Sequence, residues 1–174
     1  MALDAVKAAV VLFVCVVVQS SILSLVDVLG GTPDLVLVTL VSLALLRGSI
    51  FGAIAGFWAG LLLDTATLST LGVTALLLTV GGFWIGRYGE TTARDRTHAP
   101  FTSVLVVTIL SVIAELVLDY VLGESAPAGL AFRSIPATVV LNLILTLPVY
   151  ALTRRLFPRD RDEADRTREV RLLG

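Results

Sequence analysis

A long stretch near the start of the chain carries almost no charge. Between Ala8 and Leu46 there is no lysine or arginine, and the only acidic residues are Asp27 and Asp34. A chain of 174 residues cannot bury so much apolar surface in a water-soluble core, so lipid must cover it. In lipid the backbone has to satisfy its own hydrogen bonds, which favours helices over open strands. The sequence therefore predicts a helical integral membrane protein.

The composition of the whole chain agrees with this prediction. Hydrophobic residues make up 56% of the chain and charged residues 16%, whereas about 25% are charged in an ordinary soluble domain. A net charge of -1 argues against a nucleic-acid-binding protein, and the single cysteine, Cys15, rules out a disulfide framework. The first apolar run lacks a small-residue cleavage site, so we expect a retained helix and not a signal peptide.

Six apolar segments follow one another along the chain, at residues 5–26, 33–46, 49–63, 71–85, 101–122 and 135–152. We predict an all-α, polytopic bundle of six transmembrane helices over residues 1–153, followed by a charged cytoplasmic tail over 154–174. The second and third segments are shorter than the ~20 residues that usually span a bilayer. A re-entrant hairpin is the alternative for these two, but it would place Arg47 near the midplane at a cost of about 2.5–3.5 kcal/mol.

Positive charges are divided unevenly between the two sides that six crossings create. With the N-terminus inside, twelve of the 13 lysine and arginine residues fall on the inner side, and only Arg133 falls on the outer side. Cytoplasmic loops of membrane proteins carry such an excess of lysine and arginine. We therefore expect both termini to lie in the cytoplasm.

Four glycines recur at every fourth position of the third segment. Gly48, Gly52, Gly56 and Gly60 lie in the run RGSIFGAIAGFWAGLLLD, and on a helix they form a shallow groove along one face. In water each would cost a helix roughly 1 kcal/mol relative to alanine. In lipid, small residues let two helix backbones approach closely, and this packing drives helix association. We expect another helix of this chain to fill the groove; a helix of a partner protein is the alternative.

Ionisable residues within the segments are few, and two of them occur together. Glu115 and Asp119 are four residues apart in the fifth segment, so they share one helix face. A charged side chain in hydrocarbon is costly, so both carboxyls should face protein or water. We expect Asn142 and Gln19 to be their hydrogen-bonding companions. The set would form an interhelical polar clamp, or alternatively serve ion coupling or partner docking.

Other single residues carry less specific signals. Asp34 and Asp64 are expected near the outer face, and Pro33 before Asp34 is typical of a helix start, which favours capping over ligand binding. Trp58 is expected to pack between helices. His98 is the only histidine, so a histidine-based metal site or catalytic triad has no members to recruit. We predict no enzyme activity, no metal and no cofactor.

Four motifs in the first half of the chain resemble a known family. QSSIL (19–23), TPDLVLV (32–38), LLRGSIFGAIAGFWAGLLLD (45–64) and LGVTALLL (71–78) look like the bacterial rod shape-determining protein MreD. In that family a Pro-Asp pair opens the second helix, and an Arg-Gly turn leads to a glycine-laddered third helix that ends at an aspartate. A Leu-Gly pair then opens the fourth. The likeness covers residues 19–86; the second half matches in length, helix count and charged C-terminus.

The resemblance implies a function that the residues alone do not give. It implies a non-catalytic scaffold of the rod complex, or elongasome, in the bacterial inner membrane, supporting cell-wall elongation and cell shape. The implied partners are an MreC-like protein and, through it, a RodA-type glycosyltransferase, a class B penicillin-binding protein and the MreB filament. The family also resembles, in its six-helix architecture, the substrate-binding subunits of vitamin-uptake transporters. A small-molecule uptake subunit is therefore the alternative function.

Overall fold

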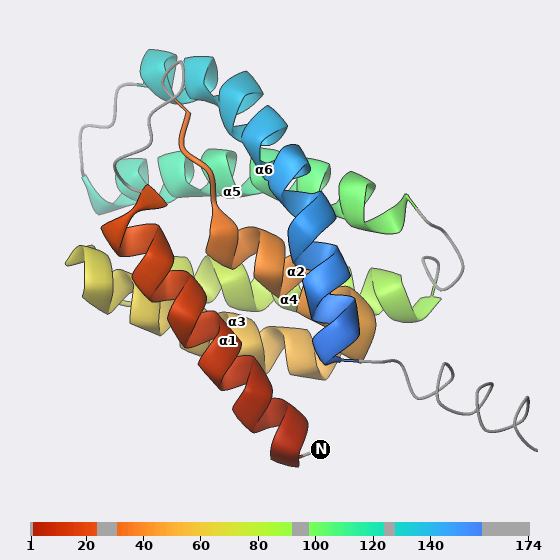
Figure 1. Cartoon of the computed structure of the whole chain (residues 1–174). Helices are drawn as coiled ribbons and strands as arrows, with labels where there is room; N and C mark the ends of the chain where they lie inside the picture. The colour runs from red at the N-terminus through yellow and green to blue at the C-terminus, as the bar shows by residue number, and fades with distance from the viewer. Residues whose placement is uncertain (1, 24–30, 92–97, 124–127, 158–174) are drawn as a thin grey trace, which may run out of the picture.

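The computed structural model describes residues 2–23, 31–91, 98–123 and 128–157. These residues form six helices and no β-strand (Figure 1). The helices are α1 (Ala2–Ser21), α2 (Leu35–Arg47), α3 (Ser49–Thr67), α4 (Val73–Thr91), α5 (Ala99–Leu122) and α6 (Ala128–Leu156). The all-helical class predicted from the sequence is therefore confirmed for the described residues.

The helix boundaries differ from those that hydrophobicity predicts. The first helix ends at Ser21 and not at residue 26, and the third continues past residue 63 to Thr67. The fourth runs to Thr91, and the sixth begins at Ala128 instead of residue 135. Among the described residues, three stretches are long and apolar enough to cross a membrane, namely Leu3–Ser21, Ser49–Thr67 and Ser134–Leu156. A bundle of six membrane spans stays a prediction.

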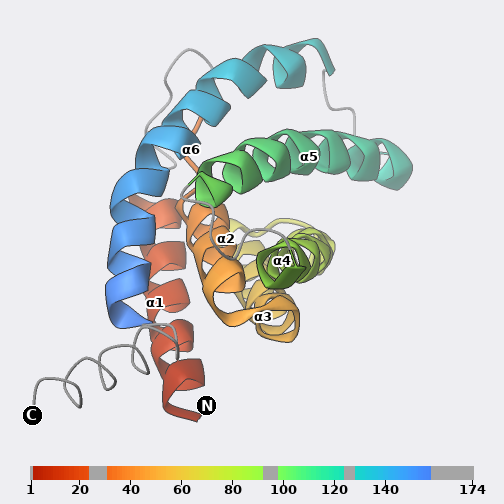
Figure 2. The same ribbon diagram turned by 90° about the vertical axis from the view of Figure 1, so that its right-hand side faces the viewer.

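Helix α2 is enclosed by the rest of the molecule. Ten of its 13 residues are buried, and it contacts each of the five other helices. Figure 2 shows it between α1 and α6 on one side and α3 and α4 on the other. At 1.5 Å per residue it is only about 20 Å long. Its start lies beside Gln19 near the end of α1 and beside Asn142 in the middle of α6.

Polar contacts gather several helix ends at one end of the molecule. Arg47, at the end of α2, forms a salt bridge with Asp4 near the start of α1, with 3.2 Å between Nη2 and Oδ1. The Arg47 guanidinium also lies 5.7 Å from the ring centre of Phe157, just after α6. Glu90, near the end of α4, accepts a hydrogen bond from the backbone N–H of Ser49 at 2.7 Å. The start of α1, the α2–α3 turn, the end of α4 and the end of α6 are therefore neighbours.

Helices α5 and α6 diverge from the α3–α4 pair toward the opposite end. In Figure 2, α3 and α4 are seen nearly end-on, whereas α5 is seen along its length and α6 arches over it. Pro136 and Pro148 lie inside α6. Each proline removes one helical N–H donor and bends the helix, so the sequence of α6 accounts for its curvature.

Candidate functional site

The glycine-lined groove of α3 is filled by α4, which runs antiparallel to it. A methyl group added at Gly56 would overlap the carbonyl oxygen of Leu78, and one added at Gly52 would overlap the carbonyl oxygen of Gly82. At Gly60 it would overlap the backbone of Ala75. These contacts leave no space for any side chain. The two backbones therefore meet directly, as close packing of membrane helices requires.

The contact is reciprocal, because glycines of α4 meet glycines of α3. A methyl group at Gly82 would overlap the backbone of Gly52, and one at Gly86 would overlap Gly48. Gly48 has a second role, since its φ of 94° forms the turn between α2 and α3. A residue with a side chain adopts such a φ only with strain. The structure thus places all four glycines of the ladder at an interface within the chain.

Asp64 organises the connection between α3 and α4. Its side chain is fully buried, and Oδ2 accepts a hydrogen bond from the N–H of Gly72 at 2.8 Å. Oδ1 lies 3.3 Å from the donating hydroxyl of Ser69, and the Asp64 carbonyl accepts from the Ser69 N–H at 3.1 Å. The carboxylate therefore satisfies donors ahead of the first turn of α4, where an anion is favoured.

A second buried polar cluster surrounds the start of α2. Asp34 caps this helix, because Oδ1 accepts a hydrogen bond from the Leu37 N–H at 2.8 Å. Oδ1 of Asn142, from α6, accepts from the backbone N–H of Asp34 at 2.7 Å. Oε1 of Gln19, from α1, accepts from the Val36 N–H at 2.8 Å. Side chains from two other helices thus satisfy the free donors at the start of α2.

This arrangement differs from the partners that the sequence predicted for Asn142 and Gln19. We expected both to accompany Glu115 and Asp119, whereas the structure brings both to the first turn of α2. Asn142 is fully buried and its amide also donates to Thr108 Oγ1 at 3.0 Å. Glu115 and Asp119 belong to α5, but their side chains lie outside the part of the structure that is described.

Glu90 is a structural carboxylate that the sequence did not single out. It lies beyond the predicted fourth segment, near the end of α4, and reaches the first turn of α3. Oε1 accepts from both the N–H and the hydroxyl of Ser49, at 2.7 and 3.0 Å. These hydrogen bonds, the N–H one foremost, hold the pKa of the Glu90 carboxyl below its ordinary value, and Arg87 adds to the effect. An acid beyond an apolar segment was the only sequence signal for this role.

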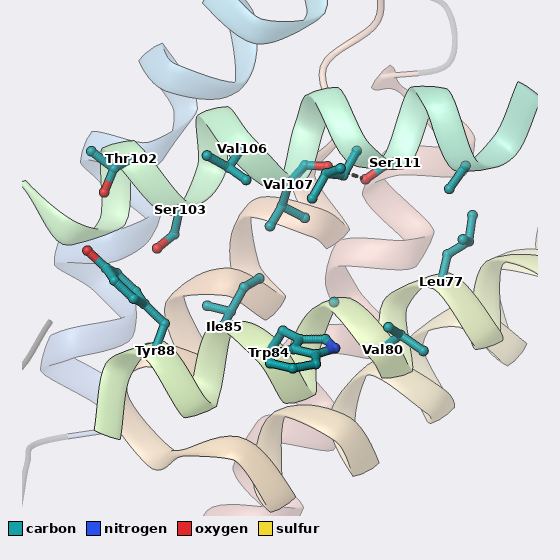
Figure 3. A pocket seen from close by; sticks show the side chains of 13 residues that line it. Leu77, Val80, Trp84, Ile85, Tyr88, Thr102, Ser103, Val106, Val107 and Ser111 are labelled. Carbon is teal, nitrogen blue, oxygen red and sulfur yellow. Dashed lines mark hydrogen bonds between the residues drawn. The ribbon is translucent and has the colours of Figure 1, made fainter. Parts of the chain in front are cut away.

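A mostly apolar cavity of about 460 Å³ lies between α4 and α5. Its lining includes Trp84 and Tyr88 from α4 and Ser103 and Leu110 from α5 (Figure 3). The other tryptophan, Trp58, does not pack between helices as predicted, since 60% of it is exposed on the surface of α3. Positions facing α4 are glycine and alanine, so bulkier residues such as Trp58 occupy the opposite side of α3.

The described part of the chain contains no group of three or more histidine, cysteine or acidic side chains that could hold a metal ion. The half-buried Asp34 and the buried Asp64 instead bond to helix ends. The hydroxyl groups of Ser42, Thr146 and Thr153 donate to carbonyls of their own helices. These acids thus serve helix ends, and these hydroxyl groups bond to the backbone of their own helices.

A family model described as rod shape-determining protein MreD matches residues 5–157. The chain belongs to the MreD family. The match covers nearly all of the described helices, including the second half, where the sequence motifs carry less of the resemblance. Searches of the curated proteins and of the solved structures returned no significant match.

Membership of the MreD family gives the chain a role in determining rod shape. MreD proteins are structural membrane proteins of the MreCD rod-shape system. The family is not a known enzyme family. The apolar helices of this MreD-family chain agree with a place in the inner membrane. Its glycine interface and buried caps are therefore parts of a membrane protein whose family acts in cell shape.

Proposed function

We propose that this protein is a non-catalytic scaffold of the rod complex that supports cell-wall elongation. The observation that carries the proposal is the family match over residues 5–157. The proposed partners are an MreC-like protein and, through it, a RodA-type glycosyltransferase, a class B penicillin-binding protein and the MreB filament. A scaffold needs a fixed shape in the membrane. Backbone-to-backbone packing of α3 on α4 supports such rigidity.

We further propose six membrane crossings with both termini in the cytoplasm. Two independent observations support this topology. Contacts of Arg47 with Asp4 and Phe157 bring the start of α1 and the end of α6 to the same end of the molecule. Lysine and arginine are concentrated in the segments expected on that side. Modification of a cysteine introduced at Arg159 by a reagent that cannot cross the membrane would contradict this topology.

Deletion of the gene and affinity purification test the scaffold. Cells without the protein should become round, and the full-length chain should restore the rod. A tagged chain, crosslinked in cells, should enrich an MreC-like protein over a tagged membrane protein of another family at matched expression. Rods that persist without the protein, together with a purification that enriches no MreC-like protein, would overturn the proposal.

A small-molecule uptake subunit gains less support. Such a subunit needs polar groups free to bind its substrate, but Asp34, Asn142 and Gln19 are engaged with the start of α2. The cavity between α4 and α5 is largely apolar in its lining. A vitamin that co-elutes stoichiometrically with the purified protein would nevertheless favour this alternative function.

A further inference from the structure

The cavity between α4 and α5 contains a glycine that the fold does not require. A methyl group added at Gly81 would meet only Cγ1 of Val107, at 3.9 Å, which is ordinary contact. The neighbouring Gly82 has no such space. Glycine is among the weakest helix formers, so Gly81 costs helix stability without serving a close contact to any described residue. Its missing side chain does deepen the cavity.

Ser103 is a polar group in this cavity that finds no hydrogen-bond partner among the residues that the structure describes. The residue is only 7% exposed, and its Oγ is buried without a hydrogen bond. Ser111, which also lines the cavity, donates to the carbonyl of Val107 at 2.7 Å. Buried hydroxyl groups are nearly always paired. Figure 3 shows Ser103 directed from α5 toward α4, so an acceptor located in the cavity would satisfy it.

Polarity changes along the cavity. Near the end of α4 and the start of α5 the cavity contains the hydroxyl groups of Tyr88 and Ser103, whereas Leu77 lies at the other end (Figure 3). The Ser111 hydroxyl, toward that other end, is bonded within α5. Arg87 directly precedes Tyr88. Its side chain forms a salt bridge with Glu90 at 3.5 Å but stays 61% exposed, so it can also face an anionic group at the Tyr88 end. A ligand that matches this pattern has a hydrocarbon chain, a hydrogen-bond acceptor next to it and an anionic group beyond the acceptor.

We infer that the α4–α5 cavity binds one acyl chain of an anionic phospholipid from the leaflet next to the α4–α5 connection. The chain lies over Gly81 and beside Leu110. The ester carbonyl accepts a hydrogen bond from Ser103 Oγ, and the phosphate lies near Arg87. This site requires only that the protein lies in a bilayer, and it does not depend on a role in the rod complex.

The two tryptophans of the chain provide a direct measurement. Both tryptophans are exposed, Trp84 at 66% and Trp58 at 60%, but Trp84 lines the cavity whereas Trp58 lies on α3. The Trp58→Phe variant leaves Trp84 as the only tryptophan, and Trp84→Phe leaves Trp58 as the matched control. Each full-length variant is reconstituted in vesicles that contain phosphatidylglycerol or phosphatidylcholine with brominated acyl chains, which quench tryptophan fluorescence on contact.

We expect brominated phosphatidylglycerol to quench Trp84 at a lower mole fraction than brominated phosphatidylcholine, and both lipids to quench Trp58 equally. Gly81→Leu should fill the cavity and abolish the lipid preference at Trp84. Ser103→Ala should weaken lipid binding about fivefold, the equivalent of one hydrogen bond, and Ser111→Ala should leave it unchanged. Ser103→Ala keeps the test decisive if Gly81→Leu does not fold.

Equal quenching of Trp84 by the two lipids would overturn the inference, as would quenching that Gly81→Leu and Ser103→Ala both leave unaltered. A disulfide between two copies of a Gly81→Cys variant in the same vesicles would also overturn it, because a second copy of the chain would then occupy the cavity.

Discussion

Two faces of α4 contain adjacent glycines with opposite roles. Gly82 lies against α3, where its backbone touches that of Gly52 and no side chain fits. Gly81, about 100° away around the helix, faces α5, where a methyl group would meet almost nothing. Glycine spacing alone therefore does not reveal an interface. The two faces differ in how closely the backbone of the neighbouring helix approaches the glycine.

The largest expected loss of stability comes from adding a side chain where the backbones of α3 and α4 touch. Gly56→Ala should lower the free energy of unfolding by about 3 kcal/mol, because the added methyl group would push against the Leu78 carbonyl on α4. Thermal unfolding of the purified protein in detergent measures the loss. An unchanged midpoint for Gly56→Ala would mean that the two backbones are not in contact.

A smaller loss of stability is expected at Asp64, which organises the connection between α3 and α4. Asp64→Ala should destabilise the protein by about 1–2 kcal/mol, because the N–H of Gly72 loses its buried acceptor. Asp64→Asn keeps an acceptor oxygen and should lose less. Thr65→Ala is the control, since Thr65 is exposed and bonds only within α3. Equal midpoints for Asp64→Ala and Thr65→Ala would refute the capping role.

On the side of α4 that faces α5, replacing glycine by alanine should stabilise the protein instead of destabilising it. Gly81→Ala should raise the free energy of unfolding by up to about 1 kcal/mol, because alanine favours the helix and its methyl group has space. The same thermal unfolding measurement applies, with Gly82→Ala as the matched substitution one position away. A destabilised Gly81→Ala would show that α5 lies closer to α4 than described.

The smallest effect concerns pH at the far end of the α3–α4 pair. The pKa of Glu90 is lowered by hydrogen bonds from Ser49, so ionised Glu90 stabilises the fold above its unfolded pKa, and this contribution is lost as pH falls through the folded pKa. Between about pH 6 and pH 3 the wild type should therefore lose more stability than Glu90→Gln. Parallel midpoint curves for the two proteins would exclude a role for the Glu90 carboxylate.

Local patterns in the sequence predicted much of this architecture. Apolar runs gave the helices, and Pro33 before Asp34 indicated the cap that the structure contains. Small residues spaced by four indicated a close helix contact. Helix ends were less predictable, because hydrophobicity stops at polar residues such as Asp64, whereas α3 continues for another turn to Thr67.

Long-range pairing could not be predicted from these patterns. Asn142 bonds to the backbone of Asp34, 108 residues earlier in the chain. A backbone N–H carries no sequence signature, whereas the acidic side chains Glu115 and Asp119 are visible in the sequence and were therefore the predicted partners of Asn142. For the same reason Glu90 was missed, since its partner is the first turn of α3. Which donors remain free at a helix start depends on tertiary structure.

The enclosure of α2 has a consequence for how the protein is made. A helix of 13 residues matches the thickness of a bilayer poorly on its own, and Asn142 in α6 completes its first turn. Translation delivers α6 last among the six helices. We therefore expect the first turn of the second helix to gain its last hydrogen-bond partner only after α6 has been synthesised.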